Sequence, residues 1–367
     1  MKCIQCGIDN TLRDRTKHSN RCKNCNHLFA FEPAIFKDYR SGLTDAFFAK
    51  AINDISANGT LYFTPKQLLY LIDKRLVRKI SSNNGQGLGC FLIIIGIAFI
   101  SNWLGYVLII VGIVLLLPKG KRNRQPQLPQ PLLVTQNQFQ DWLLRWQQIN
   151  GAVVKMLPPP RNQLAPTTVS SDVSAYSFDR VVVCDSAAIA QLLINNNFHF
   201  ENNCAVLSIT GYPQSIFATV MEMLRRNPDL QVYALHDASP QGVSLVHQLG
   251  TEPDWFQDGS AVIFDLGLSP RQILASRNIV FRSSIESSLA AQQLPEAVRQ
   301  RLSQAELQWL DSGNFVELES LTPERIIRVL NQGIAQSQNP QSSDGLVLVD
   351  YGGYGSESYI FAADNFG

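Results

Sequence analysis

Short runs of β-branched and other apolar residues alternate with helical stretches between residues 180 and 264, and this alternation constrains the fold most strongly. The runs show no polar alternation of their own, which is typical of strands buried on both faces. Helical stretches between successive strands indicate a parallel sheet covered on both sides, and hence an α/β domain. The predicted strands lie at 180–184, 204–209, 231–235 and 261–264, and the predicted helices at 187–195, 214–226 and 241–249.

Polar residues and glycine turns follow these predicted strands. Asp185 comes after the first strand, Gly211-Tyr212-Pro213 after the second, Asp237-Ala238-Ser239-Pro240-Gln241-Gly242 after the third, and Asp265-Leu266-Gly267-Leu268 after the fourth. Because the carboxyl ends of parallel strands meet at one edge, Asp185 and Asp237 are expected to lie close together. Two carboxylates beside a glycine turn can hold a hard cation such as Mg²⁺. Helix capping is the alternative role for both aspartates.

The order of these motifs resembles the toprim domain in the A subunit of type IIB DNA topoisomerases and their meiotic relatives, over residues near 175 to 285. The resemblance implies that Asp185 and Asp237 are candidate catalytic and magnesium-binding residues. It also implies that Gly211, Ser239 and Gly242 belong to cofactor-binding loops. The family's strand-end Glu is Asp185 here, and the second Asp of its paired acidic motif is Ser239. The predicted domain is therefore a degenerate toprim-like domain.

Four of the seven cysteines form two pairs near the N-terminus, Cys3-x2-Cys6 and Cys22-x2-Cys25. This spacing is typical of a structural zinc ribbon, in which two tight turns direct four thiolates at one ion. Two disulfides or a redox motif are the alternatives, and His18 or His27 could replace one ligand. Thiolate ligands indicate a reducing compartment, the cytosol.

Residues 91–117 form an uncharged apolar block that exceeds the length of about 18 residues expected of a transmembrane helix. Basic residues flank both ends of the block, which favours two crossings over one strongly tilted span. We therefore expect a transmembrane helical hairpin, a membrane location and both termini in the cytosol.

Charge is distributed unevenly along the chain, although the net charge is +1. Residues 1–86, 87–171 and 172–367 carry net charges of +7, +6 and −12. With the motifs, this asymmetry predicts a multidomain chain with a toprim-like parallel sheet. The expected parts are a zinc ribbon at 1–30, a small helical, winged-helix-like module at 31–86, the transmembrane hairpin at 87–117, Pro-rich linkers flanking an amphipathic helix at 118–171, the toprim-like domain at 172–285, and a C-terminal helical region with a last strand at 286–367.

These features together predict a membrane-anchored protein that faces the cytosol and serves binding or assembly. Its zinc would be structural, a magnesium ion would be its second cofactor, and a nucleic acid or nucleotide would be its ligand; the sequence identifies no protein partner. The absence of one acidic residue argues against catalytic turnover. The alternative function is a magnesium-dependent nuclease or nucleotidyl-transfer enzyme that resembles a topoisomerase.

Overall fold

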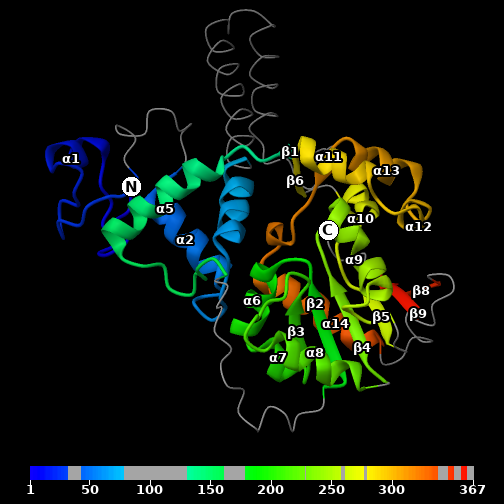
Figure 1. Cartoon of the computed structure of the whole chain (residues 1–367). Helices are drawn as coiled ribbons and strands as arrows, with labels where there is room; N and C mark the ends of the chain where they lie inside the picture. Colours follow the sequence, from blue (N-terminus) through cyan, green and yellow to red (C-terminus); the bar gives the residue numbers. More distant parts are fainter. Residues whose placement is uncertain are drawn as a thin grey trace, which may run out of the picture. The chain divides into compact units, whose positions relative to one another are not determined.

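The computed structural model describes residues 1–31, 43–77, 130–160, 178–227, 229–257, 261–276, 279–337, 346–350 and 357–361 of the chain (Figure 1). These residues form two compact units. The described residues of the first unit are 1–31, 43–51, 71–77 and 133–152, and those of the second are 52–70, 130–132 and the described residues from 153 onward.

The first unit joins the cysteine-rich segment to residues 45–51 of helix α2 (Asp45–Ile55) and to helix α5 (Gln136–Asn150). The rings of Phe31, Phe48 and Trp146 form its aromatic core, with centroids 4.9 to 6.1 Å apart. The buried carboxylate of Asp45 accepts hydrogen bonds from the N–H groups of Ala30 and Phe31 at 2.9 and 3.0 Å. Because a buried carboxylate needs such donors, these bonds fix the end of the cysteine-rich segment against α2.

The second unit is built on a six-stranded sheet with the order β3-β2-β4-β5-β9-β8. The first five of these strands are parallel, and β8 pairs antiparallel with β9. The four strands predicted between residues 180 and 264 are confirmed. The strand predicted as the last one corresponds to β8, but β9 follows it in the sequence. The strand bounds are β2 Arg180–Cys184, β3 Ala205–Ser208, β4 Gln231–Leu235, β5 Val262–Asp265, β8 Leu346–Asp350 and β9 Glu357–Phe361.

Helices cover both faces of this sheet, as the apolar strands predict. Val182 and Tyr233 belong to one buried cluster with side chains of α6 (Ala187–Asn195) and α14 (Pro323–Ser337). Val181 and Val232 belong to a second cluster with side chains of α8 (Phe217–Arg225) and α9 (Pro240–Thr251). Neighbouring residues of one strand thus point to opposite faces, and both faces are buried.

A smaller sheet has three strands. Two of them, β6 and β7, lie between β5 and α14 in the sequence, and the third, β1, comes earlier in the chain. Its order is β1-β6-β7, where β1 pairs parallel with β6 and β7 pairs antiparallel with β6. The bounds of the remaining elements are α1 Leu12–Lys17, β1 Gln130–Pro131, α7 Phe198–Glu201, α10 Pro270–Ala275, β6 Val280–Ser283, α11 Ile285–Gln292, α12 Glu296–Arg299, α13 Gln304–Asp311, β7 Asn314–Phe315 and the 3-10 helix η2 Leu318–Ser320; residues 65–77 are also helical.

The fold class and the membrane location predicted from the sequence need correction. Among the described residues, no helix combines the length and the apolar character that a bilayer crossing requires. The block at 91–117, to which the hairpin was assigned, lies outside the described residues. The described fold is an α/β sheet domain with an N-terminal four-cysteine unit, and we withdraw the transmembrane hairpin and the membrane location with two cytosolic termini.

Candidate metal sites

The four N-terminal cysteines converge as their spacing predicts. Their sulfur atoms all lie within 4.8 Å of one another, and two of the distances, Cys3 to Cys25 and Cys6 to Cys22, are 3.5 Å. None of the four is in a disulfide, which removes the disulfide alternative. Four sulfur donors at this separation fit a tetrahedral zinc ion.

The two cysteine turns are built alike. Each second cysteine is followed by a residue with a left-handed backbone, Gly7 at φ 73° and Asn26 at φ 60°. The N–H groups of these two residues donate to the carbonyl oxygens of Cys3 and Cys22, both at 2.9 Å. Glycine and asparagine tolerate this conformation better than other residues, so the sequence favours both turns.

The thiols influence one another's ionisation. Burial would raise the pKa of Cys22, but N–H groups of Cys25, Asn24 and Asn10 lower it to about 6. The N–H of His27 lowers the pKa of Cys25, yet burial and the neighbouring thiols outweigh it and raise that pKa to about 12. Four thiolates therefore need a bound cation to coexist, as a metal centre provides.

The second candidate site lies where the parallel strands end. Asp185 directly follows β2, and Asp237 lies two residues beyond β4. One oxygen of Asp185, Oδ2, accepts the N–H of Asp237 at 2.7 Å, and Asp237 Oδ1 accepts the N–H of Leu318 at 2.6 Å. The two aspartates are thus neighbours, as expected from the fold.

Neither aspartate caps a helix. Ser186 caps α6 by accepting the N–H of Ala188 at 3.2 Å, and Ser239 caps α9 by accepting the N–H of Gly242 at 3.0 Å. The capping alternative therefore applies to the serines. The other oxygen of Asp185, Oδ1, is buried and has no hydrogen-bond partner among the described residues. A buried carboxylate oxygen without a donor is suited to a cation ligand.

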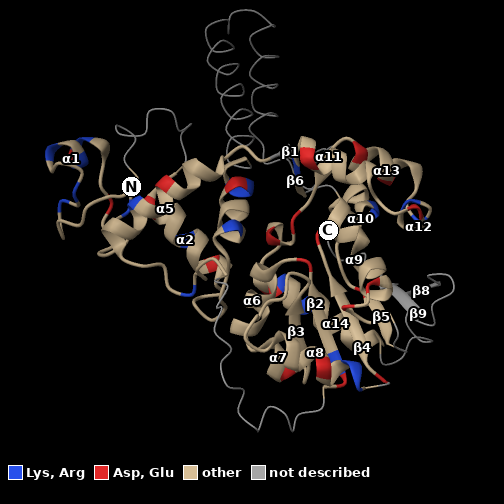
Figure 2. Cartoon of the chain, in the orientation of Figure 1, with Lys and Arg blue, Asp and Glu red and all other residues tan. Residues whose placement is uncertain are grey.

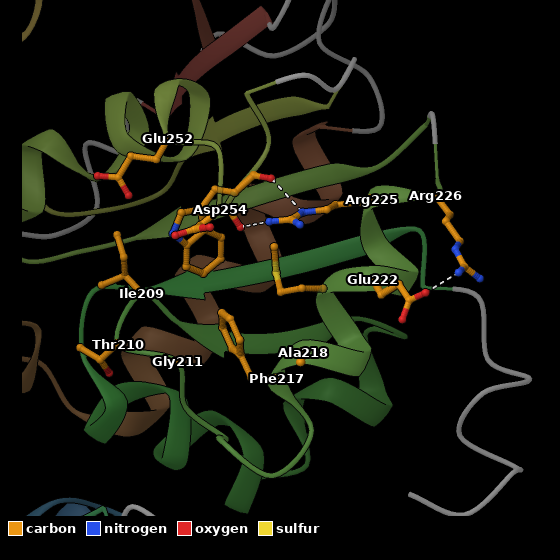
Figure 3. A pocket seen from close by; sticks show the side chains of 12 residues that line it. Ile209, Thr210, Gly211, Phe217, Ala218, Glu222, Arg225, Arg226, Glu252 and Asp254 are labelled. Carbon is orange, nitrogen blue, oxygen red and sulfur yellow. Dashed lines mark hydrogen bonds and ion pairs between the residues drawn. The ribbon is translucent and has the colours of Figure 1, made fainter. Parts of the chain in front are cut away.

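The glycines predicted in the loops have different roles. A side chain at Gly242 would place its Cβ 2.1 Å from the carbonyl oxygen of Asp237, so only glycine lets α9 start so close to this loop. Gly211 has a left-handed backbone at φ 83° and lines a separate cavity of about 760 Å³, together with residues of α8 and the segment 252–255 (Figure 3). Figure 3 shows Arg225 of α8 reaching across this cavity toward the backbone at Asp254.

Two glutamates that sequence analysis did not identify lie next to Asp237. Glu317 and Glu319 flank Leu318, whose N–H binds the Asp237 carboxylate, and they are only 8% and 4% exposed. Ala238 and Val316 exchange two backbone hydrogen bonds, at 2.9 and 3.0 Å, which hold this segment beside the loop after β4. In the sequence, this segment shows only two glutamates on either side of Leu318. This local pattern does not indicate a contact with Asp237.

The two cations beside these glutamates, Lys66 and Arg282, form their ion pairs with Glu317. Glu317 receives Lys66 Nζ at 2.9 Å, Tyr70 Oη at 2.7 Å and Arg282 at 3.3 Å. Burial would raise the pKa of Glu317, but Lys66 and these donors lower it below its ordinary value. Burial raises the pKa of Glu319 to about 7, an increase that Lys66 opposes and Glu317 and Asp185 support.

The pKa values of Asp185 and Asp237 are raised, as that of Glu319 is. Burial raises the pKa of Asp185, although the N–H of Asp237 and the charge of His236 oppose it. Burial together with the charges of Asp185 and Glu319 raises the pKa of Asp237 well above its ordinary value. Three buried carboxyl groups thus repel one another, a state relieved by protonation or by a cation.

His236 supports the loop that carries Asp237. Its ring is 2% exposed, with Nδ1 2.8 Å from the Asp237 carbonyl oxygen and Nε2 2.9 Å from Asp265 Oδ1. Asp265 Oδ1 also accepts the N–H of Gly267, so both ring nitrogens face acceptors and both must donate. Burial would lower the pKa of His236, but Asp265 outweighs it and raises that pKa to about 9. The ring is therefore a buried imidazolium.

The acidic site is looser than the cysteine site. Among the residues that the structure describes, no second group of three or more Cys, His, Asp or Glu side chains converges as closely as the four cysteines. A cation at Asp185 and Asp237 would therefore keep other ligands, such as waters or phosphate oxygens. Mg²⁺ commonly binds in this way, through one or two carboxylates.

Comparison with known families supports this interpretation of the second unit. Residues 180–261 match the family of toprim domains from Spo11 and the topoisomerase 6 A subunit. No curated protein matches the chain. The chain thus contains a toprim domain of this kind, over less than a quarter of its length, together with an N-terminal four-cysteine cluster whose geometry fits a zinc ion. The matched residues include Asp185, Asp237 and Ser239, whereas Glu317 and Glu319 lie outside them.

Proposed function

We propose that the toprim domain binds a divalent cation such as Mg²⁺ at Asp185 and Asp237, and through it a phosphate group of a nucleic acid or nucleotide. The observation that carries the proposal is the buried, unpartnered Oδ1 atom of Asp185 beside Asp237, at the carboxyl ends of two adjacent parallel strands. Ligands of open α/β sheets bind at this edge.

The charge of the domain makes the cation necessary for this function. Residues 172–367 carry a net charge of −12, and Figure 2 shows more acidic than basic segments over the second unit. Two nearby cations, Lys66 and Arg282, are engaged by Glu317. Phosphate would be repelled without a bound cation, since nucleic acids bind mainly through positive charge. Binding should therefore depend on Mg²⁺.

Binding without turnover is the form of the proposal that the residues favour. Ser239 stands where the resembling family has the second acid of its paired motif, and its hydroxyl is used to cap α9. A site with fewer carboxylates holds its cation more weakly and leaves more of its coordination sphere to the ligand. The domain would then serve as a cation-dependent binding module beside a structural four-cysteine unit.

The test is fluorescence anisotropy of labelled single- and double-stranded oligonucleotides with the full, zinc-loaded chain, with and without Mg²⁺. Asp237→Asn keeps an oxygen for the Leu318 N–H but removes the charge, and Asp311→Asn removes an acidic charge from α13. We expect Mg²⁺-dependent binding that Asp237→Asn weakens at least about tenfold and Asp311→Asn leaves unchanged. Binding that is equal without Mg²⁺ contradicts the proposal. Mg²⁺-dependent cutting that disappears in Asp237→Asn instead supports the enzyme alternative.

A further inference from the structure

Glu319 is placed at the acidic site by a segment distant in sequence. Val316 pairs with Ala238 through two backbone hydrogen bonds, and Leu318 donates its N–H to Asp237 at 2.6 Å. The side chain of Leu318 is buried in the core between the sheet, α6 and α14, which fixes the segment from the other side. The position of Glu319 is therefore set by backbone bonds and core packing, whatever its own side chain does.

The two glutamates of this segment differ in their partners. Glu317 accepts hydrogen bonds from Lys66, Tyr70 and Arg282, so its charge is satisfied. Glu319 is 4% exposed, and no other residue in the described ranges donates a hydrogen bond to it. Lys66, which Glu319 shares with Glu317, is the cation that acts on it. Burying a carboxylate that receives no hydrogen bond from another residue and only a share of one cation is costly. This cost is difficult to explain if the residue serves packing alone, since Leu318 already fills the core.

We propose that Glu319 supplies the third carboxylate of the cation site, in place of the one that is missing at Ser239. The inference rests on the proposed cation binding at Asp185 and Asp237 and adds a carboxylate from outside the matched residues 180–261. Because these carboxylates do not converge as closely as the cysteines, Glu319 would act on the ion through one of its bound waters.

The charges are consistent with this assignment. His236 is matched by Asp265, and Lys66 and Arg282 form ion pairs with Glu317. Lys66 also acts on Glu319. The four carboxylates of Asp185, Asp237, Glu317 and Glu319 thus share two cations, and a divalent cation would balance the two negative charges that remain.

The experiment is a Mn²⁺ titration of the full, zinc-loaded chain, followed by the electron paramagnetic resonance signal of free Mn²⁺ and by competition with Mg²⁺. Glu319→Gln removes the charge at nearly constant shape. Glu306→Gln is the matched control, because Glu306 is also 4% exposed but holds the cap of α13 through Ser303. Ser239→Asp, alone and combined with Glu319→Gln, restores an acid at the position where the family has one. Asp caps a helix as well as Ser does, so α9 should be preserved.

We expect Glu319→Gln to weaken Mn²⁺ binding about 10- to 100-fold and Glu306→Gln to change it less than twofold. In the Ser239→Asp background, Glu319→Gln should weaken binding much less. If Glu319→Gln binds Mn²⁺ as tightly as the wild type does, the inference about Glu319 is overturned. The proposed function still stands in that case if Asp237→Asn abolishes Mn²⁺ binding. A loss that is equally large in the Ser239→Asp background also overturns the inference. If the zinc-loaded wild-type chain binds no Mn²⁺, both the inference and the proposed function fail.

Discussion

Gly267 allows the backbone after β5 to pass against the buried ring of His236. A Cβ atom at this position would lie 2.3 to 2.5 Å from the ring atoms Cδ2, Nε2 and Cγ. The ring cannot turn away without losing its hydrogen bonds to Asp265 and to the Asp237 carbonyl. The N–H of Leu268 also binds the carbonyl oxygen of His236 at 2.8 Å, which ties the two segments together.

Replacement of Gly267 by Ala should therefore be strongly destabilising. Overpacking a dense core costs about 1–3 kcal/mol. Loss of one hydrogen bond between charged groups adds about 1.5–3 kcal/mol. We expect Gly267→Ala to lower the free energy of unfolding by about 2.5–6 kcal/mol, measured by urea denaturation followed by circular dichroism.

Gly333 provides the matched control. The three atoms nearest to a Cβ there are Cδ2, Cδ1 and Cγ of Leu266, at 2.6, 2.7 and 3.2 Å, and a leucine side chain can shift more easily than a ring held by two hydrogen bonds. Gly333 also lies inside α14, where Ala is favoured over Gly by about 1 kcal/mol. Gly333→Ala should cost clearly less than Gly267→Ala. A Gly267→Ala chain within about 0.5 kcal/mol of wild type would refute the assigned role of His236.

Two further predictions concern metal and pH. The chain should hold about one zinc ion, and Cys3→Ser with Cys22→Ser should remove it together with the folded structure of the cysteine-rich segment, because binding and folding are one equilibrium; elemental analysis that finds no zinc in the wild type would contradict this. The raised pKa of His236 means that its stabilising contribution, on the order of 3 kcal/mol, is complete below about pH 6.5 and lost as the pH rises through about 9. The stability difference between wild type and Asp265→Asn should accordingly be large at pH 6.5 and small at pH 10; a difference that does not change with pH would exclude a charged pair.

The strands and their acidic ends could be predicted because the information is local. Runs such as Arg180–Cys184 are apolar on both faces, and the residue after each run reaches the ligand edge of a parallel sheet. The cysteine site was predictable for the same reason, since two tight turns and their spacing determine its geometry.

The rest of the acidic site could not be predicted because it depends on distant pairing. The segment that carries Glu319 is held beside Asp237 by the bridge between Ala238 and Val316 and by the Leu318 N–H, and Lys66 meets Glu317 from a helix early in the chain. Strand β9 also joins the sheet next to β5, although nearly 100 residues separate them in the sequence.

The most direct test of the account is the anomalous diffraction signal of a crystal of the zinc-loaded chain soaked in Mn²⁺. We expect two separate metal positions: zinc among the four cysteines, and manganese about 2.0–2.6 Å from Asp185 Oδ1, with Asp237 also in its coordination sphere. The proposed cation site would be contradicted if Asp185 and Asp237 were well ordered in a crystal soaked at a saturating Mn²⁺ concentration and no manganese lay beside them.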